Sequence, residues 1–426
     1  MKKKYKVELE KSPELKRLFS EVEMAYKNKM FLGAQRALQF GGEQIMKHNS
    51  KLYNCTVTYC DRVEVFKEIK YQLLAGSGVG FSVQKQHIIK MPLVKRKNSD
   101  KTMMFQIPDS IEGWSDSVQV LMESYMDENS KYFGANILFD YSLIREKGSL
   151  ITGGFKAPGH KPLKKALETI INLINEQFKD KDIDSFKMEP ILAYDIIMFI
   201  ADAVISGGVR RSATICMFSK DDDKMLNAKT GDWHIKNPQR GRSNNSVMLL
   251  RKETSLAEFQ HIMKSVKDVG EPGFIFTDNL EYLYNPCVEI GMKPVTKDGR
   301  TGFQSCNLTE INGAKSTSKE IFFEQCKVAS IMGTLQAGYT DFKYLTKATK
   351  EIVEREALIG VGITGIMNNP DILTDVEVLK EGAEEVKKWN KKVAKLIGIN
   401  QAARTCCVKP SGNASVILEC GSGIHG

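Results

Sequence analysis

The sequence predicts an α/β fold built mainly from parallel strands. Segments rich in β-branched and aromatic residues, such as 52–59 and 136–140, alternate with helical patterns such as 162–178 along the whole chain. This alternation is typical of strands that are joined by crossover helices. With 426 residues, of which 42% are hydrophobic and 27% charged, the chain is long enough to bury one large core.

The first half of the chain is expected to begin with a polar, mostly helical lead-in over residues 1–50. Ser12-Pro13 is a helix-start signal, and apolar residues follow it at roughly helical spacing. The next expected elements are a strand over 52–59, a helix over 62–74, a helix over 113–125, a strand over 136–140, and helices over 162–178 and 189–205. The last of these helices is apolar nearly all round, which predicts that it is buried.

The second half continues the alternation. The expected elements are strands beginning near 243 and 270, helices over 317–337, 342–357 and 380–397, and strands over 360–365 and 406–408. The chain has no internal repeat, low-complexity tract or linker. It is therefore divided into the lead-in, residues 1–50, and one large domain, residues 51–426.

Charge and composition narrow the class of partner. A net charge of +9 and a pI near 8.9 suit anionic partners, but the basic residues are dispersed and not interleaved with aromatic residues. Nucleotides therefore fit at least as well as a polymer, and no specific nucleic acid is expected. Nine cysteines without a signal peptide or a long apolar run predict a cytoplasmic protein that does not enter a membrane.

The histidines are too scattered to suggest a metal site. Six of them are spread along the chain without an HExxH motif or a CxxC motif, so no directly bound metal is predicted. Cysteines that have no assigned chemistry are expected to be small buried hydrophobes; these are Cys60, Cys216, Cys326, Cys406, Cys407 and Cys420.

A cysteine and a carboxylate stand two residues apart in the stretch 285–290, NPCVEI. On an extended loop such residues point the same way, so the Cys287 thiol and the Glu289 carboxylate could converge on one ligand. The negative charge raises the pKa of the thiol and withholds the thiolate, which makes Cys287 a poor nucleophile. The pair therefore indicates hydrogen-atom chemistry rather than acyl transfer. A further cysteine, Cys306, follows in the sequence SCNL.

Three stretches could hold an anion. Residues 76–81, GSGVGF, let backbone N–H groups approach a phosphate, but they follow a helix and lack a P-loop lysine, so alone they predict a tight turn. Residues 206–214, SGGVRRSAT, could grip phosphate or carboxylate through two guanidinium groups, or form a solvated turn. Residues 411–415 form a Ser/Gly turn that offers hydroxyl and N–H groups.

Taken in order, the motifs resemble the catalytic subunit of ribonucleotide reductases, above all its adenosylcobalamin-dependent (class II) branch. They are the NC of 54–55, GSGVGFSV, GGVRRSA, SNNSV, GEPGF, NPCVEI, SCNL and KPSGNAS. Each motif is weak singly, but eight of them in sequence across residues 54–426 make the resemblance specific. It implies a ten-stranded α/β barrel made of two five-stranded halves, with a finger loop through its centre.

The resemblance implies reduction of ribonucleotides to 2′-deoxyribonucleotides, for DNA synthesis, by a thiyl-radical mechanism. Cys287 would sit at the tip of the finger loop as the thiyl radical that takes a hydrogen atom from C3′ of the ribose. Glu289 would be the general base on the 3′-hydroxyl, and Asn285 would hydrogen-bond the sugar hydroxyls. Cys55 and Cys306 would deliver two electrons and become a disulfide, which a thioredoxin-type or other dithiol would reduce.

The resemblance also implies where the substrate and an effector bind. The phosphates of a ribonucleoside di- or triphosphate would be cradled by Pro410, Ser411, Gly412, Asn413, Ala414 and Ser415, with Asn54, Gly78, Val79 and Gly80 lining the site. A dNTP or ATP effector would bind near Asp109 and the loop around Arg145 and Gly153, in a possible homodimer. Effector identity would be relayed to substrate choice by Ser206, Gly207, Gly208, Arg210 and Arg211.

The sequence departs from the family in three places. Val288 stands where glycine is common, which is tolerable if the loop is extended. The N-terminus shows no ATP-cone-like segment, so control of overall activity by ATP and dATP is not expected. The sequence stops at Gly426, where the family continues with further barrel segments and a cysteine-bearing tail. The closing elements of the barrel are therefore expected to be missing, and activity to require a complementing C-terminal fragment.

Other interpretations remain. Glu289 argues against the glycyl-radical branch of the family, and motif likeness favours adenosylcobalamin over use with a metal-bearing radical-generating subunit, which is the class I-like alternative. A cysteine hydrolase would need a histidine beside Cys287, and the nearest in sequence, His261, lies in a probable helix. A non-catalytic nucleotide-binding subunit is the better rival.

Overall fold

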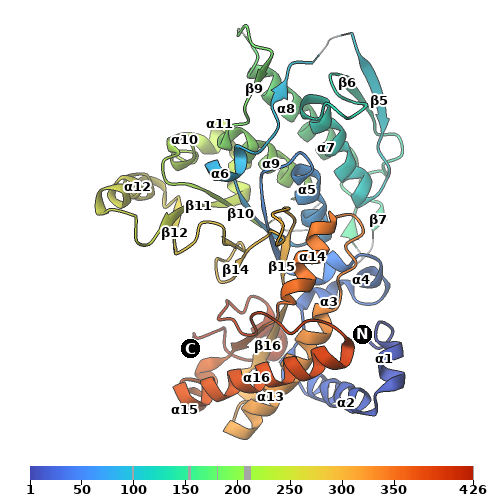
Figure 1. Cartoon of the computed structure of the whole chain (residues 1–426), viewed down its shortest axis with the longest axis vertical. Helices are drawn as coiled ribbons and strands as arrows, with labels where there is room; N and C mark the ends of the chain where they lie inside the picture. Colours follow the sequence, from blue (N-terminus) through green and yellow to red (C-terminus); the bar gives the residue numbers. More distant parts are fainter. Residues whose placement is uncertain (98–99, 152–154, 180, 206–212, 426) are drawn as a thin grey trace. The chain divides into compact units, whose positions relative to one another are not determined.

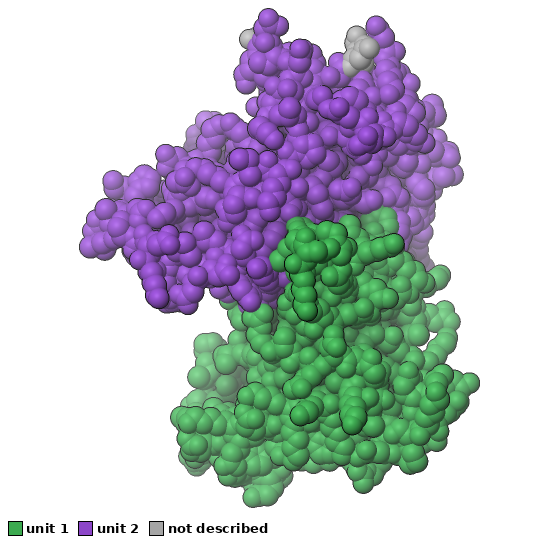
Figure 2. Space-filling view, in the orientation of Figure 1, with its two compact units in different colours: residues 1–56, 287–290, 295–426 green, residues 57–286, 291–294 purple. Residues whose placement is uncertain are grey.

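A computed structural model describes residues 1–426 except 98–99, 152–154, 180, 206–212 and 426 (Figure 1). The chain forms two compact units, which are coloured separately in Figure 2. Unit 1 contains residues 1–56, 287–290 and 295–426, and unit 2 contains residues 57–286 and 291–294. The short segment 287–290, with the cysteine and carboxylate singled out above, is therefore part of unit 1.

Unit 1 is built around a sheet with the strand order β1-β16-β17. Strand β16 (Leu308–Asn312) pairs in parallel with β17 (Gly360–Thr364) and antiparallel with the short β1 (Phe31–Leu32). The helices of this unit are α1 (Lys6–Lys11), α2 (Pro13–Lys27), α3 (Gln35–Phe40), α4 (Glu43–Lys47), α13 (Lys319–Ala337), α14 (Lys347–Glu356), α15 (Pro370–Leu373), α16 (Val376–Ile397) and α17 (Ala414–Leu418). Helices α13 and α16 pack against each other, and α13 also covers β16.

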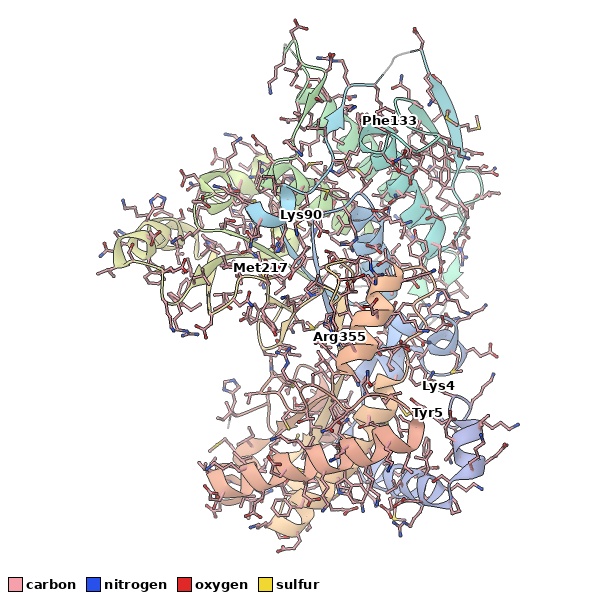
Figure 3. The ribbon with its side chains drawn as sticks, viewed as in Figure 1. Lys4, Tyr5, Lys90, Phe133, Met217 and Arg355 are labelled. Carbon is pink, nitrogen blue, oxygen red and sulfur yellow. The ribbon has the colours of Figure 1, made fainter. Side chains whose placement is uncertain are left out.

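Tyr5 and helix α2 belong to the core of unit 1. Helix α2 begins where the sequence predicts, because the Ser12 side chain accepts a hydrogen bond from the Leu15 amide and Pro13 occupies the first turn. Tyr5, which is labelled with Lys4 in Figure 3, is buried and donates a hydrogen bond of 2.6 Å to the Leu335 carbonyl of α13. The Lys4 ammonium lies over the Tyr339 ring. The lead-in is thus tied to the same core as the strands.

Unit 2 holds strands in the order β12-β11-β10-β3-β2. The neighbouring pairs β12 (Gly273–Thr277) with β11 (Ser243–Leu250), β11 with β10 (Thr214–Ser219), and β10 with β3 (Gly78–Ser82) are parallel. Strand β2 (Cys55–Tyr59) begins in unit 1 with its first two residues. The parallel α/β arrangement expected from the sequence is therefore confirmed for these strands.

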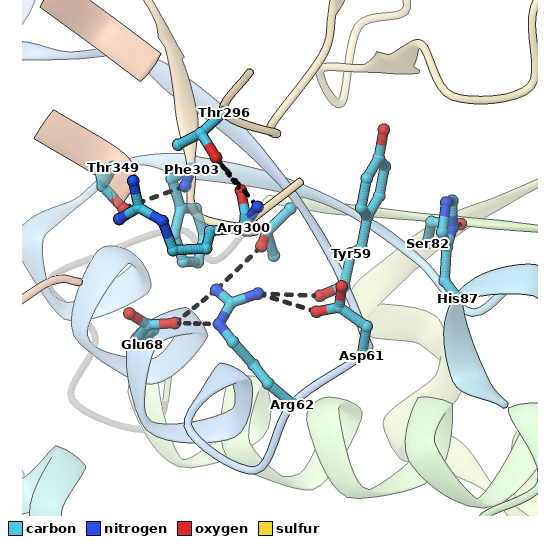
Figure 4. A network of polar contacts seen from close by, with 11 residues as sticks. Tyr59, Asp61, Arg62, Glu68, Ser82, His87, Thr296, Arg300, Phe303 and Thr349 are labelled. Atoms are coloured by element: carbon cyan, nitrogen blue, oxygen red, sulfur yellow. Dashed lines mark hydrogen bonds and ion pairs between the residues drawn. The ribbon is translucent and has the colours of Figure 1, made fainter. Parts of the chain in front are cut away.

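Four helices of unit 2 agree closely with the expected ranges: α5 (Val65–Ala75), α7 (Ile111–Met126), α8 (Lys161–Glu176) and α9 (Pro190–Ile205). Helix α12 (Leu256–Val269), for which no range was expected, also belongs to this unit. Helix α9 is buried as predicted, with Ile196, Ile197 and Ile200 fully shielded from solvent. At the start of α5, buried Glu68 accepts two hydrogen bonds from Arg62, which also pairs with Asp61 (Figure 4).

None of the helices in the described part of the chain has the length and apolar character of a membrane span.

Two expectations about local structure are wrong. Residues 78–82 form a fully buried strand, β3, rather than the tight turn that the glycines alone predicted. Residues 406–408 do not form a strand, because only Cys406 makes an isolated bridge, to Val361 of β17. In both places the decisive partner lies far away in the sequence.

Candidate functional site

The segment 287–290 does not have the extended backbone on which the sequence interpretation relied. Val288 has φ of +66°, in the left-handed region that suits glycine and strains a β-branched residue by about 1–2 kcal/mol. Its side chain is 39% exposed. The loop is therefore not extended at Val288, as the sequence interpretation required for valine to replace the common glycine without strain. It stores backbone strain beside Cys287.

The Cys287 thiol is held in its neutral form. The residue as a whole is exposed, but its thiol is partly shielded from solvent, and the pKa of the thiol is raised to about 11. Burial is the largest cause, followed by the negative charge of Glu289 and by Cys55, while Lys409 acts in the opposite direction. The predicted effect of the carboxylate on the pKa of this thiol is thus confirmed in direction, but desolvation exceeds it.

Cys55 and Cys306 lie side by side in unit 1. Both are free thiols, and they hydrogen-bond through their side chains. That hydrogen bond is the largest cause, ahead of burial, of a pKa for Cys306 well above its ordinary value. The structure therefore brings together the two cysteines that the resemblance pairs, and Glu289 also raises the pKa of Cys306.

Several polar contacts fix β15 (Gln304–Cys306), the strand that carries Cys306. The Thr56 hydroxyl donates to the Gln304 carbonyl at 2.9 Å, and the Phe303 amide donates to the Thr349 hydroxyl of α14 at 3.0 Å. Just before the strand, residues 295–301 turn back on themselves, with the Arg300 amide donating to the Thr296 hydroxyl at 2.9 Å (Figure 4). The start of the strand that carries Cys306 is therefore held by hydrogen bonds with the side chains of Thr56 and Thr349.

Glu289 presents an unpaired oxygen. Its Oε2 atom is buried and has no hydrogen-bond partner among the residues that the structure describes. A buried carboxylate oxygen without a partner carries a desolvation penalty, which a ligand hydroxyl could relieve. This is the geometry expected of a group that accepts a hydrogen bond or a proton from a bound molecule.

The loop before α17 gathers hydroxyl groups. Ser411, which is buried, donates to the Ser415 hydroxyl at 3.0 Å and lies 3.0 Å from the hydroxyl of Ser422. Gly412 has φ of +53°, where glycine is favoured, and the Ala414 amide donates to the Ser411 carbonyl. The turn predicted at 411–415 is present, and its hydroxyls currently bond to one another.

In unit 2, the glycines of β3 make room for the chain segment that precedes Cys287. A Cβ atom on Gly80 would stand 2.1 Å from the Tyr284 carbonyl oxygen, and one on Gly78 would stand 3.1 Å from the Pro286 ring. The Tyr284 amide in turn donates to the sulfur of Met217 on β10, which Figure 3 labels. Asn285 lies between these contacts and is fully buried. A role for Asn285, Gly78, Val79 and Gly80 in binding substrate stays a prediction.

Part of the predicted effector region can be located. Asp109 and Arg145 form an ion pair, with 2.6 Å between Oδ2 and Nε. The loop with Ser206, Gly207, Gly208, Arg210 and Arg211, and also Gly153, lie outside the described residues. The structure thus brings together two of the residues assigned to the effector, whose role stays a prediction.

Three charged residues of unit 1 escaped the sequence interpretation. Lys409 and Glu310 form a buried ion pair of 2.5 Å, and Lys409 opposes the rise in the pKa of Cys287. The signals in the sequence were a lysine next to the Pro-Ser-Gly turn and a glutamate that stands next to an isoleucine in LTEIN, the stretch that forms β16. Arg36 was also missed; its pKa is lowered by burial and raised by nearby Cys55.

The described residues contain no group of three or more His, Cys, Asp or Glu side chains arranged to hold a metal ion. An organometallic cofactor that reacts by approaching a thiol needs no such group, but it needs an accessible sulfur. Exposed Cys287, with the apolar side chain of Val288 beside it, fits that requirement.

Known proteins point in one direction. Residues 82–174 match the family model described as the B12-dependent ribonucleotide reductase insertion domain. A probable adenosylcobalamin-dependent ribonucleoside-triphosphate reductase from Dictyostelium discoideum is 28% identical over 76% of this chain and 42% of its own length. The adenosylcobalamin-dependent ribonucleoside-triphosphate reductase of Lactobacillus leichmannii is 22% identical, over 83% of this chain and 55% of its own length.

The fold comparison agrees. A crystal structure of a B12-dependent (class II) ribonucleotide reductase superposes with a TM-score of 0.80 at 20% sequence identity, covering 98% of this chain and 69% of that chain. This likeness confirms the α/β fold that the sequence resemblance implied. The chain spans about half the length of the curated relatives that it matches.

Proposed function

We propose that this chain, which is related in sequence and in fold to the cobalamin-dependent (class II) ribonucleotide reductases, reduces ribonucleotides to 2′-deoxyribonucleotides. The observation that carries the proposal is the clustering of three thiols and one carboxylate within unit 1. Cys287 is under the electrostatic influence of both Glu289 and Cys55, and Cys55 hydrogen-bonds to Cys306. A neutral thiol beside an unpaired carboxylate and a dithiol suits radical chemistry better than nucleophilic attack.

The roles follow from the chemistry of each group. The Cys287 thiyl radical takes the hydrogen atom from C3′ of the ribose, and Glu289 accepts the proton of the 3′-hydroxyl. The 2′-hydroxyl leaves as water after it is protonated. Cys55 and Cys306 supply two electrons and two protons and become a disulfide, and Cys287 returns the hydrogen atom to C3′. Asn285, two residues before Cys287, would hydrogen-bond the sugar hydroxyls.

Adenosylcobalamin, when bound, would supply the radical that converts the Cys287 thiol to the thiyl form. The assignment of adenosylcobalamin to this chain rests on the named relatives and on the accessibility of the Cys287 thiol beside Val288. The loop strain at Val288 would help to keep Cys287 in one orientation toward it. The protein's own contribution is to hold the sulfur neutral and to keep Glu289 unpaired.

The substrate is proposed to be a ribonucleoside triphosphate, since the relatives are named as triphosphate reductases. Its phosphates would replace the mutual hydrogen bonds of Ser411, Ser415 and Ser422. A small or protein dithiol would reduce the disulfide after each turnover. A dNTP or ATP effector would bind beside the ion pair of Asp109 and Arg145, whose side chains are 29% and 42% exposed.

The test is formation of deoxynucleotide by the 426-residue chain, supplied with a complementing C-terminal fragment and incubated without oxygen with a ribonucleoside triphosphate, adenosylcobalamin and dithiothreitol. The expected result is product together with an electron paramagnetic resonance signal from cobalt(II) coupled to a thiyl radical. The Cys287→Ala variant should show neither. Nucleotide binding without product or radical would contradict the proposal. Activity that depended on a di-metal protein would show that this protein, and not adenosylcobalamin, is the radical source.

A further inference from the structure

Unit 1 contains an ion pair that the proposed mechanism does not use. The ammonium of Lys409 lies 2.5 Å from Oε2 of Glu310, and the two side chains are only 9% and 4% exposed. Oε1 of Glu310 is also buried, with no hydrogen-bond partner among the described residues. Such a pair is costly to desolvate and is rarely kept for stability alone. Its position therefore suggests a role in function.

The fold reserves space for this pair. Glu310 on β16 faces Gly362 on β17 in the strand register. A Cβ atom on Gly362 would stand 3.4 Å from each of three atoms: Oε2 of Glu310, Cγ of Lys409 and the carbonyl oxygen of Cys407. A larger side chain at position 362 would compete with both charged groups for the same volume. The absence of a side chain at Gly362 of β17 therefore leaves room for the side chains of Lys409 and Glu310.

Lys409 connects the thiols with the loop of hydroxyls. Its ammonium donates a hydrogen bond of 3.2 Å to the carbonyl of Pro410, the first residue of that loop. Its charge also lowers the pKa of both Cys287 and Cys407, against the larger effect of burial. The lysine thus lies within electrostatic reach of the catalytic thiol and directly beside the segment that would receive phosphate.

We propose that the phosphates of a bound nucleotide take Lys409 away from Glu310, and that the Glu310 carboxylate then binds one proton from the solvent. The inference rests on the proposed phosphate site at 410–415. Phosphate is a stronger partner for the ammonium because it brings more negative charge and more acceptor oxygens than one carboxylate. The proton keeps the abandoned carboxylate from remaining charged and unpaired in the core.

The charges around Glu310 determine the sign of this proton uptake. Burial raises the pKa of Glu310 to about 6, and Lys409 is the cause that lowers it. When Lys409 moves to phosphate, that opposing influence is lost and the pKa rises further, so the carboxyl becomes protonated near neutral pH. The other titratable groups that sense Glu310 are the thiols of Cys407 and Cys420, whose raised pKa values keep them neutral.

Calorimetric titration of the full chain with a ribonucleoside triphosphate tests the proposal. Titrations at pH 7.5 in buffers of different ionisation enthalpy measure how many protons are taken up on binding. The wild-type protein should take up close to one more proton than the Glu310→Gln variant. Glu381→Gln, which removes the acid of the exposed Lys319–Glu381 pair, is the matched control and should behave as the wild type.

Affinity provides a second readout. Lys409→Met should weaken binding of the triphosphate, and of inorganic tripolyphosphate, by about 10- to 100-fold, because a charge-assisted contact is lost. Lys319→Met should leave it unchanged. Glu310→Gln should bind more tightly than the wild type at pH 8, and the two affinities should converge at pH 5, where the wild-type Glu310 is already protonated.

The outcomes separate this inference from the proposed function. Tight binding without extra proton uptake, together with an unaffected Lys409→Met variant, would overturn the inference and leave the reductase proposal standing. Absence of nucleotide and tripolyphosphate binding would contradict the phosphate site and the inference with it. If Glu310→Gln does not fold, infrared difference spectra of the wild type replace it: a protonated carboxyl band must appear on adding tripolyphosphate, and its absence overturns the inference.

Discussion

The backbone of Gly80 lies so close to that of Tyr284 that a Cβ atom on residue 80 would stand 2.1 Å from the Tyr284 carbonyl oxygen. Because that oxygen belongs to the main chain, it can move only if the segment leading to Cys287 moves with it. Gly80→Ala should therefore destabilise the protein by about 1–3 kcal/mol, as overpacking does, and lower turnover. Chemical denaturation and the reductase assay measure the two effects.

A matched glycine serves as the control for this substitution. A Cβ atom on Gly241 would meet only the Trp233 ring, at 3.7 Å, which is ordinary contact. Gly241→Ala should keep the wild-type stability within about 0.5 kcal/mol. Equal effects of the two substitutions would show that the close approach at Gly80 is unimportant.

The second prediction concerns the reactivity of Cys287. Since its pKa is raised to about 11, the thiol should react slowly with iodoacetamide at pH 7.5 and progressively faster as pH rises toward that value. Removing the negative charge with Glu289→Gln should lower the pKa and speed alkylation, whereas Lys409→Met should raise the pKa and slow it. Peptide-level mass spectrometry measures the rate at Cys287 separately from the other thiols.

The third prediction concerns the source of electrons. Without an added dithiol, the prereduced chain should form no more than about one deoxynucleotide per active site and should end with a disulfide between Cys55 and Cys306. Peptide mapping detects that linkage. Cys306→Ser should abolish it, whereas Cys406→Ser, which alters an exposed thiol, should not. Repeated turnover by Cys306→Ser would contradict the pairing.

The fourth prediction concerns loop strain. Val288→Gly should relieve the strain of the left-handed backbone conformation and stabilise the protein by up to about 1 kcal/mol. The net gain is small because glycine gives the unfolded chain more conformational entropy, which offsets most of the relieved strain. The freer loop should hold Cys287 less firmly and lower turnover. Urea denaturation together with the reductase assay checks the opposite signs, and a loss of both stability and turnover would refute the strain argument.

Local patterns were sufficient for much of the fold. Helix α9 was predicted from its apolar composition and α8 from its periodicity, because both signals lie within one stretch of sequence. The glycines of β3 were misread as a turn, because glycine permits either a turn or a close backbone approach. The residue that decides between them, Tyr284, is some two hundred positions away in the sequence.

The same limit applies to the candidate site. Cys287, Glu289 and the Cys55–Cys306 pair were found because short motifs carry them, and the resemblance supplied their pairing. Lys409 and Glu310 were missed, since neither residue is informative until the segment after Cys406, which bridges to Val361 of β17, brings Lys409 within 2.5 Å of Glu310 on β16. The left-handed conformation of Val288 was also beyond a sequence argument, because valine ordinarily avoids it.

Burial of the thiols in unit 1 has a consequence for the resting protein. Hydrogen peroxide oxidises the thiolate form of cysteine, and the pKa values of Cys287, Cys306 and Cys407 are all raised, so these side chains stay protonated near neutral pH. A protein that keeps reducing equivalents in such a form loses few of them to peroxide between turnovers. Burial at Cys287 and Cys407, and the hydrogen bond with Cys55 at Cys306, thus also protect these thiols against oxidation.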